Sequence, residues 1–303
     1  MKSVLLPTTH LLLALSVVFV WGTNFVVIRW GLDDLPPLLF ATLRFAFSAL
    51  PWLLFIPRPS APWRKLAGFG VLLGVGQFGL LFLAMRNDIS PGMASLVVQS
   101  QVFFTIGLSL LLMGERLRLV QAVGLLLALA GLGMIALNVN ASVTIFGVTL
   151  VLAAAFFWAC ANLVVKSLGP VNMLHFMVWS SVFAVPPLFV LSWWFEGPQA
   201  MVAGVQQASA LVWASVLWQA VGNTLFAYGA WNWLLARHPA ATVAPWALLV
   251  PVFGMSASAL LLGEPLPLWK LGAAALVLLG LAVIVCWPLL QARRSQGAIS
   301  PDA

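Results

Sequence analysis

Long apolar segments follow one another along almost the whole chain, separated by short groups of Pro, Gly, Asn and charged residues. From Leu119 to Val165 there is no Asp, Glu, Lys or Arg, and the polar stretch Asn138–Thr144 divides this run into two parts. Each part is about 20 residues long and does not alternate between apolar and polar positions, as barrel strands do over about 10 residues. The pattern therefore predicts membrane-spanning α-helices.

Ten such helices are predicted when Pro, Gly, Asn and charged residues are taken as the breaks between them. Ten spans of about 20 residues use about 200 positions, which leaves no room for a separate soluble domain. Only one connection is long, Glu196–Gln207, and we expect it to be a loop. The expected spans are Leu11–Trp30, Leu38–Ile56, Leu66–Arg86, Gly92–Met113, Leu119–Leu137, Ile145–Leu168, Met173–Phe195, Ala208–Leu235, Ala240–Leu262 and Leu268–Leu290.

The composition excludes a soluble globular protein. Hydrophobic residues make up 63% of the 303 positions and charged residues only 7%, whereas soluble domains contain about 25% charged residues. The net charge of +7 does not indicate a nucleic-acid partner, because the 14 Lys and Arg residues are scattered singly or in pairs. We therefore expect two partners, the lipid bilayer and a small-molecule substrate, and no nucleic acid.

The distribution of Lys and Arg predicts the orientation. With the N-terminus inside, ten of the 14 cations are cytoplasmic and four lie in the outer half, as the positive-inside rule requires. Both termini are then cytoplasmic, in a multi-pass protein of the inner membrane. The ten are Lys2, Arg58, Arg64, Lys65, Arg116, Arg118, Lys166, Arg237, Arg293 and Arg294, and the four are Arg29, Arg44, Arg86 and Lys270.

Three short matches in the same order predict an internal duplication. The matches pair Trp21–Arg29 with Trp158–Lys166, Val75–Gln77 with Val221–Asn223, and Gly114-Glu115 with Gly263-Glu264. Because each copy holds five spans, an odd number, the second copy enters the membrane from the opposite face, which is the inverted-repeat architecture of many transporters. We expect a first repeat at 1–140, a second at 141–290 and a cytoplasmic tail at 291–303.

Several segments resemble the EamA-type branch of the drug/metabolite transporter superfamily, and the resemblance covers essentially the whole chain. These segments are Trp21–Ile28, Pro36-Pro37, Leu43–Phe45, Ala94–Thr105, Gly114–Leu117, Val243–Pro245 and Leu249–Val252. The resemblance implies an all-α carrier with two five-helix modules. It also implies export of amino acids and related metabolites of the cysteine and O-acetylserine type, by alternating access.

The eighth expected helix departs from that pattern because it is unusually aromatic, with Trp218, Trp231 and Trp233. Aromatic or other neutral amino acids, purine-like compounds and drugs are therefore alternative substrates.

Four side-chain amides near the centres of spans are candidates for substrate binding: Gln77, Gln99, Gln101 and Asn223. Polar groups in lipid are costly, so they face the bundle interior or a wet cavity, and an amide can both donate to and accept from a zwitterion. Gln77 and Asn223 occupy matching positions of the two repeats, which predicts that they converge. Gln99 and Gln101 are about 200° apart on an α-helix, so we expect only one of them to line the cavity. The alternative role is hydrogen bonding between helices.

Arg44 lies well inside the second span, and no acidic residue lies within any span to pair with it. Three partners are open: backbone carbonyls, outer lipid headgroups reached by snorkelling, and a substrate carboxylate.

Two further groups are candidates for the same site. Trp21, Trp158 and Trp246 lie deep in their spans, where an indole can wall a substrate pocket or fill the core. Pro245 and Pro251 interrupt the ninth span, where a broken helix can expose carbonyls to a cavity and serve gating, or can form a passive kink.

An enzyme is the alternative from another functional class. Asp33-Asp34 has no second acidic cluster to act with, and His10, His175 and His238 are isolated at span ends. We therefore expect no catalytic residue, no metal site and no cofactor.

Coupling and assembly are less constrained by the sequence. All seven Asp and Glu residues fall at span ends or outside, so we expect facilitated transport, with proton coupling through an end residue such as Glu115 as the alternative. The oligomeric state is open, and a monomer is sufficient for this architecture.

Overall fold

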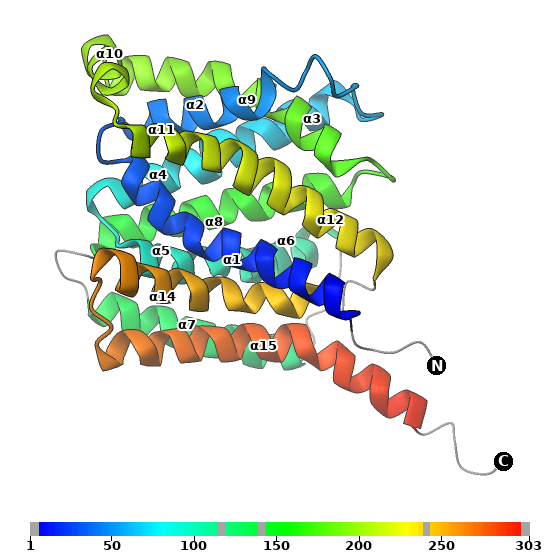
Figure 1. Cartoon of the computed structure of the whole chain (residues 1–303). Coiled ribbons are helices and arrows are strands. Elements are labelled where there is room, and N and C mark those ends of the chain that lie inside the picture. The colour runs from blue at the N-terminus through cyan, green and yellow to red at the C-terminus, as the bar shows by residue number, and fades with distance from the viewer. Residues whose placement is uncertain (1–5, 114–118, 139–142, 239–242, 298–303) are drawn as a thin grey trace.

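The structure is a computed structural model that describes residues 6–113, 119–138, 143–238 and 243–297. Within those ranges the chain is helical apart from turns and one isolated bridge between Ile89 and Val143. The helices lie side by side in one bundle, and the beginning of α1 (Thr8–Gly31) and the end of α15 (Leu268–Gly297) lie at the same end of it (Figure 1).

The two halves of the chain contain corresponding elements. The first half adds to α1 the elements α2 (Pro37–Ala49), α3 (Trp63–Val71), η1 (Leu72–Gly79), α4 (Leu80–Asn87), α5 (Pro91–Val97), η2 (Val98–Ser100), α6 (Gln101–Met113) and α7 (Leu119–Leu137). The second half contains α8 (Ile145–Lys166), α9 (Met173–Phe195), α10 (Pro198–Gln207), α11 (Ala210–Leu217), η3 (Trp218–Ala227), α12 (Tyr228–Arg237), η4 (Ala244–Leu249), α14 (Val250–Leu262) and α15.

Seven helices of the described chain are long and apolar enough to cross a membrane. Each of these corresponds to one of the predicted spans. Three shorter apolar helices, Pro37–Ala49, Trp246–Leu262 and Leu268–Ile284, correspond to the other three. The chain is therefore an all-helical, multi-pass membrane protein.

Three predicted boundaries are wrong. α2 ends at Ala49 rather than Ile56, because Pro51 has no N–H to continue the helical hydrogen bonds. The connection expected to be a loop contains α10, which starts with a proline in its first turn, where the absent N–H has no helical partner to lose. Residues 291–297, expected in the tail, continue α15.

Departures from α-helical geometry occur at corresponding places in the two halves. η1 and η3 are π-helical segments, and each is continuous with α-helices on both sides. η2 and η4 are 3₁₀ segments followed directly by α6 and α14. Because Gln77 lies in η1 and Asn223 in η3, the matching amides share an unusual backbone as well as a sequence position.

The contacts between helices also correspond. Two pairs join equivalent elements of the two halves, α7 with α15 and α2 with α9, and α5 packs against α14. α1 packs against η3, α11, α12 and α14, and α8 packs in the same way against η1, α3, α4 and α6. α1 and α8 therefore hold equivalent places in the middle of the bundle (Figure 1).

Glu196 joins the two halves by capping the start of α2. Its carboxylate accepts hydrogen bonds from the backbone N–H groups of Leu38 (2.6 Å) and Leu39 (3.0 Å) and from the Ser192 hydroxyl (2.6 Å). The N–H groups of a first helical turn have no partners within the helix, and the helix dipole favours a negative charge there. Burial raises the pKa of the Glu196 carboxyl above its ordinary value, and these hydrogen bonds oppose part of that shift.

Glu264 holds the start of α5 in a similar way. It accepts from the backbone N–H of Gly92 at 3.0 Å and from the Ser90 hydroxyl, and it pairs with Lys270 at 2.9 Å. The side chains of Lys270 and Glu264 are only 2% and 7% exposed. A buried ion pair of this kind is costly to break, because the remaining charge would have no partner.

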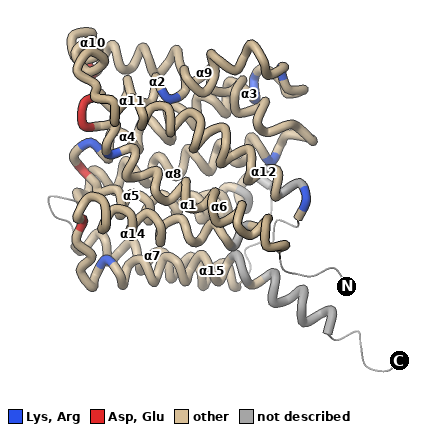
Figure 2. Tube along the Cα trace, viewed as in Figure 1, with Lys and Arg blue, Asp and Glu red and all other residues tan. Residues whose placement is uncertain are grey.

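Charge is distributed unequally between the two ends of the bundle (Figure 2). Every Asp and Glu of the described residues follows the C-terminal end of a helix at one end, here called the acidic end; they are Asp33, Asp34, Asp88, Glu196 and Glu264. The opposite end, where α1 begins, carries Lys and Arg without a described acidic residue and is called the basic end.

Gly70 provides a test of the helix packing, because a Cβ there would overlap the backbone carbonyl of Ser180 in α9. Gly70→Ala should destabilise the protein by about 1–3 kcal/mol, the usual cost of overpacking, and should lower the midpoint of thermal unfolding in detergent. Gly68→Ala is the matched control, since nothing lies within 4 Å of its added Cβ. Equal midpoints for the two variants would contradict the close contact between α3 and α9.

Candidate functional site

A cavity of about 320 Å³ lies in the middle of the bundle, between α1 and α8. Its wall is mainly apolar and aromatic, with six side-chain amides and the hydroxyl of one tyrosine. The lining residues are Trp21, Asn24, Phe25, Ile28, Phe69, Leu73, Gln77, Phe78, Leu81, Val98, Gln99, Gln101, Trp158, Asn162, Val165, Met173, Met177, Asn223, Tyr228, Trp231, Ala247 and Val250. None of them is Asp, Glu, Lys, Arg or His.

The structure brings six of the eight predicted substrate-binding residues to this cavity. They are Gln77, Gln99, Gln101, Asn223, Trp21 and Trp158. Gln77 and Asn223 converge from η1 and η3 as the duplication predicts. A π-helical segment widens the turn and is often found at functional sites.

Gln99 and Gln101 both line the cavity, which corrects the expectation that only one of them would. The 3₁₀ segment η2 precedes Gln101 and contains Gln99. On an α-helix, positions two apart lie about 200° apart, or about 160° by the shorter way round. With about three residues per turn, as in a 3₁₀ segment, the shorter angle falls to about 120°. The two amides therefore reach adjacent parts of one wall.

Gln101 is tied to a second amide of the same wall. Its Oε1 accepts from Asn162 Nδ2 at 2.9 Å and from the Thr105 hydroxyl at 3.5 Å. Gln77 differs, because its Oε1 is buried and accepts a hydrogen bond from no group that the structure describes. A buried acceptor without a partner is costly, and a ligand donor in the cavity would relieve that cost.

Arg44 lies behind the cavity wall rather than on it. Its side chain is fully buried, and its Cζ stacks 3.4 Å from the centroid of Phe78, a lining residue. Nη1 donates to Gln219 Oε1 at 2.8 Å, and Nη2 donates to the Thr224 hydroxyl at 3.5 Å. Its described hydrogen-bond partners are therefore polar side chains of η3 rather than backbone carbonyls, and its buried Nε has no partner among the described residues.

Trp246 is the other predicted residue that does not line the cavity. It packs against a separate cluster formed by Ala14, Leu234 and Val243. Its neighbour in η4, Ala247, takes the place on the wall. The helical geometry changes at Leu249, since η4 ends there and α14 begins at Val250.

The two proline positions coincide with that change. Pro245 lies in η4, and Pro251 lies in the first turn of α14, where a missing N–H breaks no helical hydrogen bond. The predicted interruption of the ninth span is present, and its role in gating stays a prediction.

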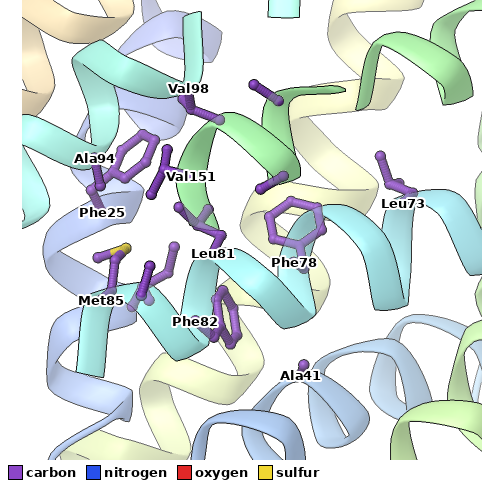
Figure 3. Close-up of a cluster of buried hydrophobic side chains, with 14 of the residues drawn as sticks. Phe25, Ala41, Leu73, Phe78, Leu81, Phe82, Met85, Ala94, Val98 and Val151 are labelled. Atoms are coloured by element: carbon purple, nitrogen blue, oxygen red, sulfur yellow. The ribbon is translucent and has the colours of Figure 1, made fainter. Parts of the chain in front are cut away.

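A second hollow of about 520 Å³ lies at the acidic end. It is lined by Arg29, Trp30, Asp33, Met85, Arg86, Asn87, Ile89, Ser90, Pro91, Leu262 and Glu264. α4 runs from one space to the other, with Leu81 in the cavity wall and Met85 in the hollow. Both belong to the buried apolar cluster of Figure 3, which also contains Phe25, Ala94 and Val98.

The sequence did not predict the place of four polar residues at the site, namely Gln219, Asn24, Asn162 and Tyr228. Gln219 is fully buried and joins Arg44 to Asn24, which lines the cavity. One feature of the sequence could have revealed Gln219. It lies four residues before Asn223, and residues four apart on a helix share a face.

No group of three or more His, Cys, Asp or Glu residues that could hold a metal ion occurs in the described ranges. The cavity can therefore offer hydrogen bonds, aromatic faces and apolar surface to a ligand.

Comparisons with known proteins identify the class. Residues 8–137 and 145–286 each match the EamA-like transporter family, and the chain belongs to this family. One match lies in each half of the chain. Membership of a transporter family also favours transport over the enzyme alternative.

Relatives of similar length support the same class. The chain is 39% identical over 279 residues to proteins of Salmonella typhimurium and Escherichia coli, each named "Probable amino-acid metabolite efflux pump", with 90% of this chain and 93% of each relative covered. It is 29% identical over 279 residues to the uncharacterized transporter YoaV of Bacillus subtilis, with 88% and 93% covered. One crystal structure, 18% identical, shares the fold with a TM-score of 0.56 over 95% of this chain and 99% of its own.

The double substitution Gln77→Leu with Asn223→Leu tests the two matching amides. It should leave the amount of protein in the membrane unchanged and reduce efflux at least about tenfold, because the hydrogen bonds they offer to a charged ligand are lost. The measurement is efflux from preloaded cells at equal expression. The control is Gln206→Leu, on the exposed part of α10. Normal efflux by the double variant would leave these amides a packing role only.

Proposed function

We propose that the protein exports neutral, zwitterionic amino acids and closely related metabolites across the inner membrane by alternating access. The observation that carries this proposal is the central cavity, whose lining combines six amides with aromatic and apolar side chains and contains no Asp, Glu, Lys, Arg or His. Amides hold both an ammonium and a carboxylate by hydrogen bonds without placing a second full charge in the membrane.

The aromatic part of the wall favours a substrate with an apolar, aromatic or sulfur-containing side chain. Trp21 packs against Tyr228 and Trp231, with ring centroids 5.5 and 5.1 Å apart, and Met173 and Met177 lie in the same wall. Such surfaces bind apolar groups and sulfur and also attract an ammonium. The names of the 39% identical relatives agree with an amino-acid metabolite as substrate.

Ten spans in two inverted repeats are part of the same proposal. The paired π-helical and 3₁₀ segments, the equivalent places of α1 and α8, and the two family matches support it. In this proposal the first repeat comprises residues 1–140 and the second comprises residues 141–290. An inverted pair provides two similar packings, one open to each side, around a central site.

The direction of opening follows from the lining residues. Phe69 in α3, Val165 in the last turn of α8 and Met173 at the start of α9 extend the cavity wall toward the basic end. Toward the acidic end, α4 continues from Leu81 in the cavity wall to Met85 in the second hollow, and Phe82 and Ala84 between them are fully buried. We assign the basic end to the cytoplasm by the positive-inside rule, so that this arrangement accepts substrate from inside.

Export is tested by challenging expressing cells with toxic concentrations of cysteine, O-acetylserine, methionine, phenylalanine, tryptophan and purine analogues. Growth should be rescued for amino acids with apolar, aromatic or sulfur-containing side chains, because these match the amide and aromatic wall. Rescue by purine analogues alone would contradict the proposed substrate class. In proteoliposomes the substrate should equilibrate in either direction, and a protonophore should leave the final distribution unchanged, since no carboxylate lines the cavity.

Reporter fusions test the orientation. Fusions after the C-terminal residue and within Arg58–Lys65 should report the cytoplasm, and a fusion within α10 should report the periplasm, because α10 lies at the acidic end (Figure 1). Alkaline phosphatase and green fluorescent protein activities give opposite readings and serve as mutual controls. Phosphatase activity at the C-terminus would contradict the orientation, and together with a cytoplasmic reading within Arg58–Lys65 it would contradict an even number of spans.

A further inference from the structure

Arg44 is a buried cation without a carboxylate partner among the described residues. The described ion pairs are Arg29 with Asp33 and Lys270 with Glu264, both at the acidic end. The guanidinium is instead held by one amide, one hydroxyl and the face of Phe78. Since Phe78 is part of the cavity wall, a positive charge lies directly behind that wall and is weakly screened by water.

The Arg44 guanidinium fixes the direction of the hydrogen bonds that it makes. An arginine side chain can only donate, so the atom of Gln219 that faces Arg44 Nη1 must be the oxygen. The amide nitrogen of Gln219 then faces Asn24, and because it donates, the atom of Asn24 at 2.8 Å must be Oδ1. The guanidinium therefore determines which atom is oxygen and which is nitrogen in both amides.

The chain of hydrogen bonds ends in the cavity. Asn24 lines the cavity, and no described group accepts a hydrogen bond from its Nδ2. With Oδ1 engaged by Gln219, Asn24 presents N–H groups to the cavity and not an acceptor. Successive hydrogen bonds polarise one another in a medium of low dielectric constant, which makes this donor stronger. The wall at Asn24 is thus suited to an anionic group.

An acceptor lies elsewhere on the same wall. Gln77, adjacent in sequence to Phe78, has its buried Oε1 without a described donor, and it lines the cavity with Asn24. A donor backed by a positive charge and a free acceptor in one cavity match the carboxylate and the ammonium of an amino acid.

We propose that Asn24 binds the carboxylate of the substrate and that Gln219 and Arg44, which do not touch the substrate, are positioning residues that fix Asn24 as a donor. This inference rests on the proposed function, because it presumes an amino-acid substrate. It explains how a cation that never faces the cavity makes the site selective for a carboxylate.

The test replaces Gln219 by glutamate, which has the same shape. A carboxylate at 219 can pair with Arg44 but has no N–H to give to Asn24, so the Asn24 amide must turn its own N–H toward position 219 and present oxygen to the cavity. The control, Gln206→Glu, adds the same charge on the exposed part of α10 and should behave as the wild type. Asn24→Asp is the second variant, because it removes the donor at the cavity directly.

The readout is the dissociation constant in detergent, measured by calorimetry, for two matched ligand pairs. These are L-phenylalanine with 2-phenylethylamine and L-methionine with 3-(methylthio)propylamine, the amines lacking only the carboxylate. The wild type should prefer each amino acid over its amine. In Gln219→Glu and Asn24→Asp this preference should fall at least about tenfold, the effect expected when a hydrogen bond to a charged group is lost, while amine binding is retained or strengthened.

The outcomes separate the inference from the function on which it rests. A purely structural role of Gln219 would weaken amino acids and amines by the same factor, and an unchanged preference in either variant would overturn the carboxylate assignment alone. A wild type that binds none of the four ligands would overturn the proposed function and the inference together.

Discussion

Every polar group of the backbone must find its partner inside the protein where the surroundings are lipid, and the rest of this structure depends on that constraint. Regular helices meet it by themselves, and they form most of the bundle. The π-helical and 3₁₀ segments occur instead in the middle, in η1, η2, η3 and η4, next to the cavity. Irregular backbone is tolerated where it is buried in protein or lines a cavity, and in η3 the Thr224 hydroxyl donates to the Gln219 carbonyl at 2.9 Å. The cavity and the helix irregularities therefore occur together for one physical reason.

Much of the helical framework could be predicted from the sequence, because a span is encoded locally by about 20 consecutive apolar residues. α7 and α9 have the predicted bounds. The errors occur where single residues decide the geometry. Pro51 ends α2 early, and Pro198 starts a helix in the expected loop. Hydropathy averaged over a span does not show where a single proline ends or starts a helix, so it could not reveal either boundary.

The candidate site was predictable in a similar, partial way. The depth of an amide in a span is visible in the sequence, and Gln77, Gln99, Gln101 and Asn223 were found by it. What a side chain faces depends on helix rotation and on distant partners, which are not local properties. Arg44 thus points to η3, 175 residues from Gln219 in the chain. Trp246 does not line the cavity, whereas Ala247, the next residue of the 3₁₀ segment η4, does.

The neutrality of the cavity lining has a consequence for energetics. A membrane potential acts on charge that crosses the bilayer, at about 2.3 kcal/mol per elementary charge per 100 mV. A zwitterion held by neutral amides carries no net charge, and the fixed charge of Arg44 belongs to the protein in the loaded and the empty carrier alike. Loading the cavity therefore leaves the work done by the field unchanged. An exporter of the proposed kind should therefore continue to release substrate when the cell is depolarised.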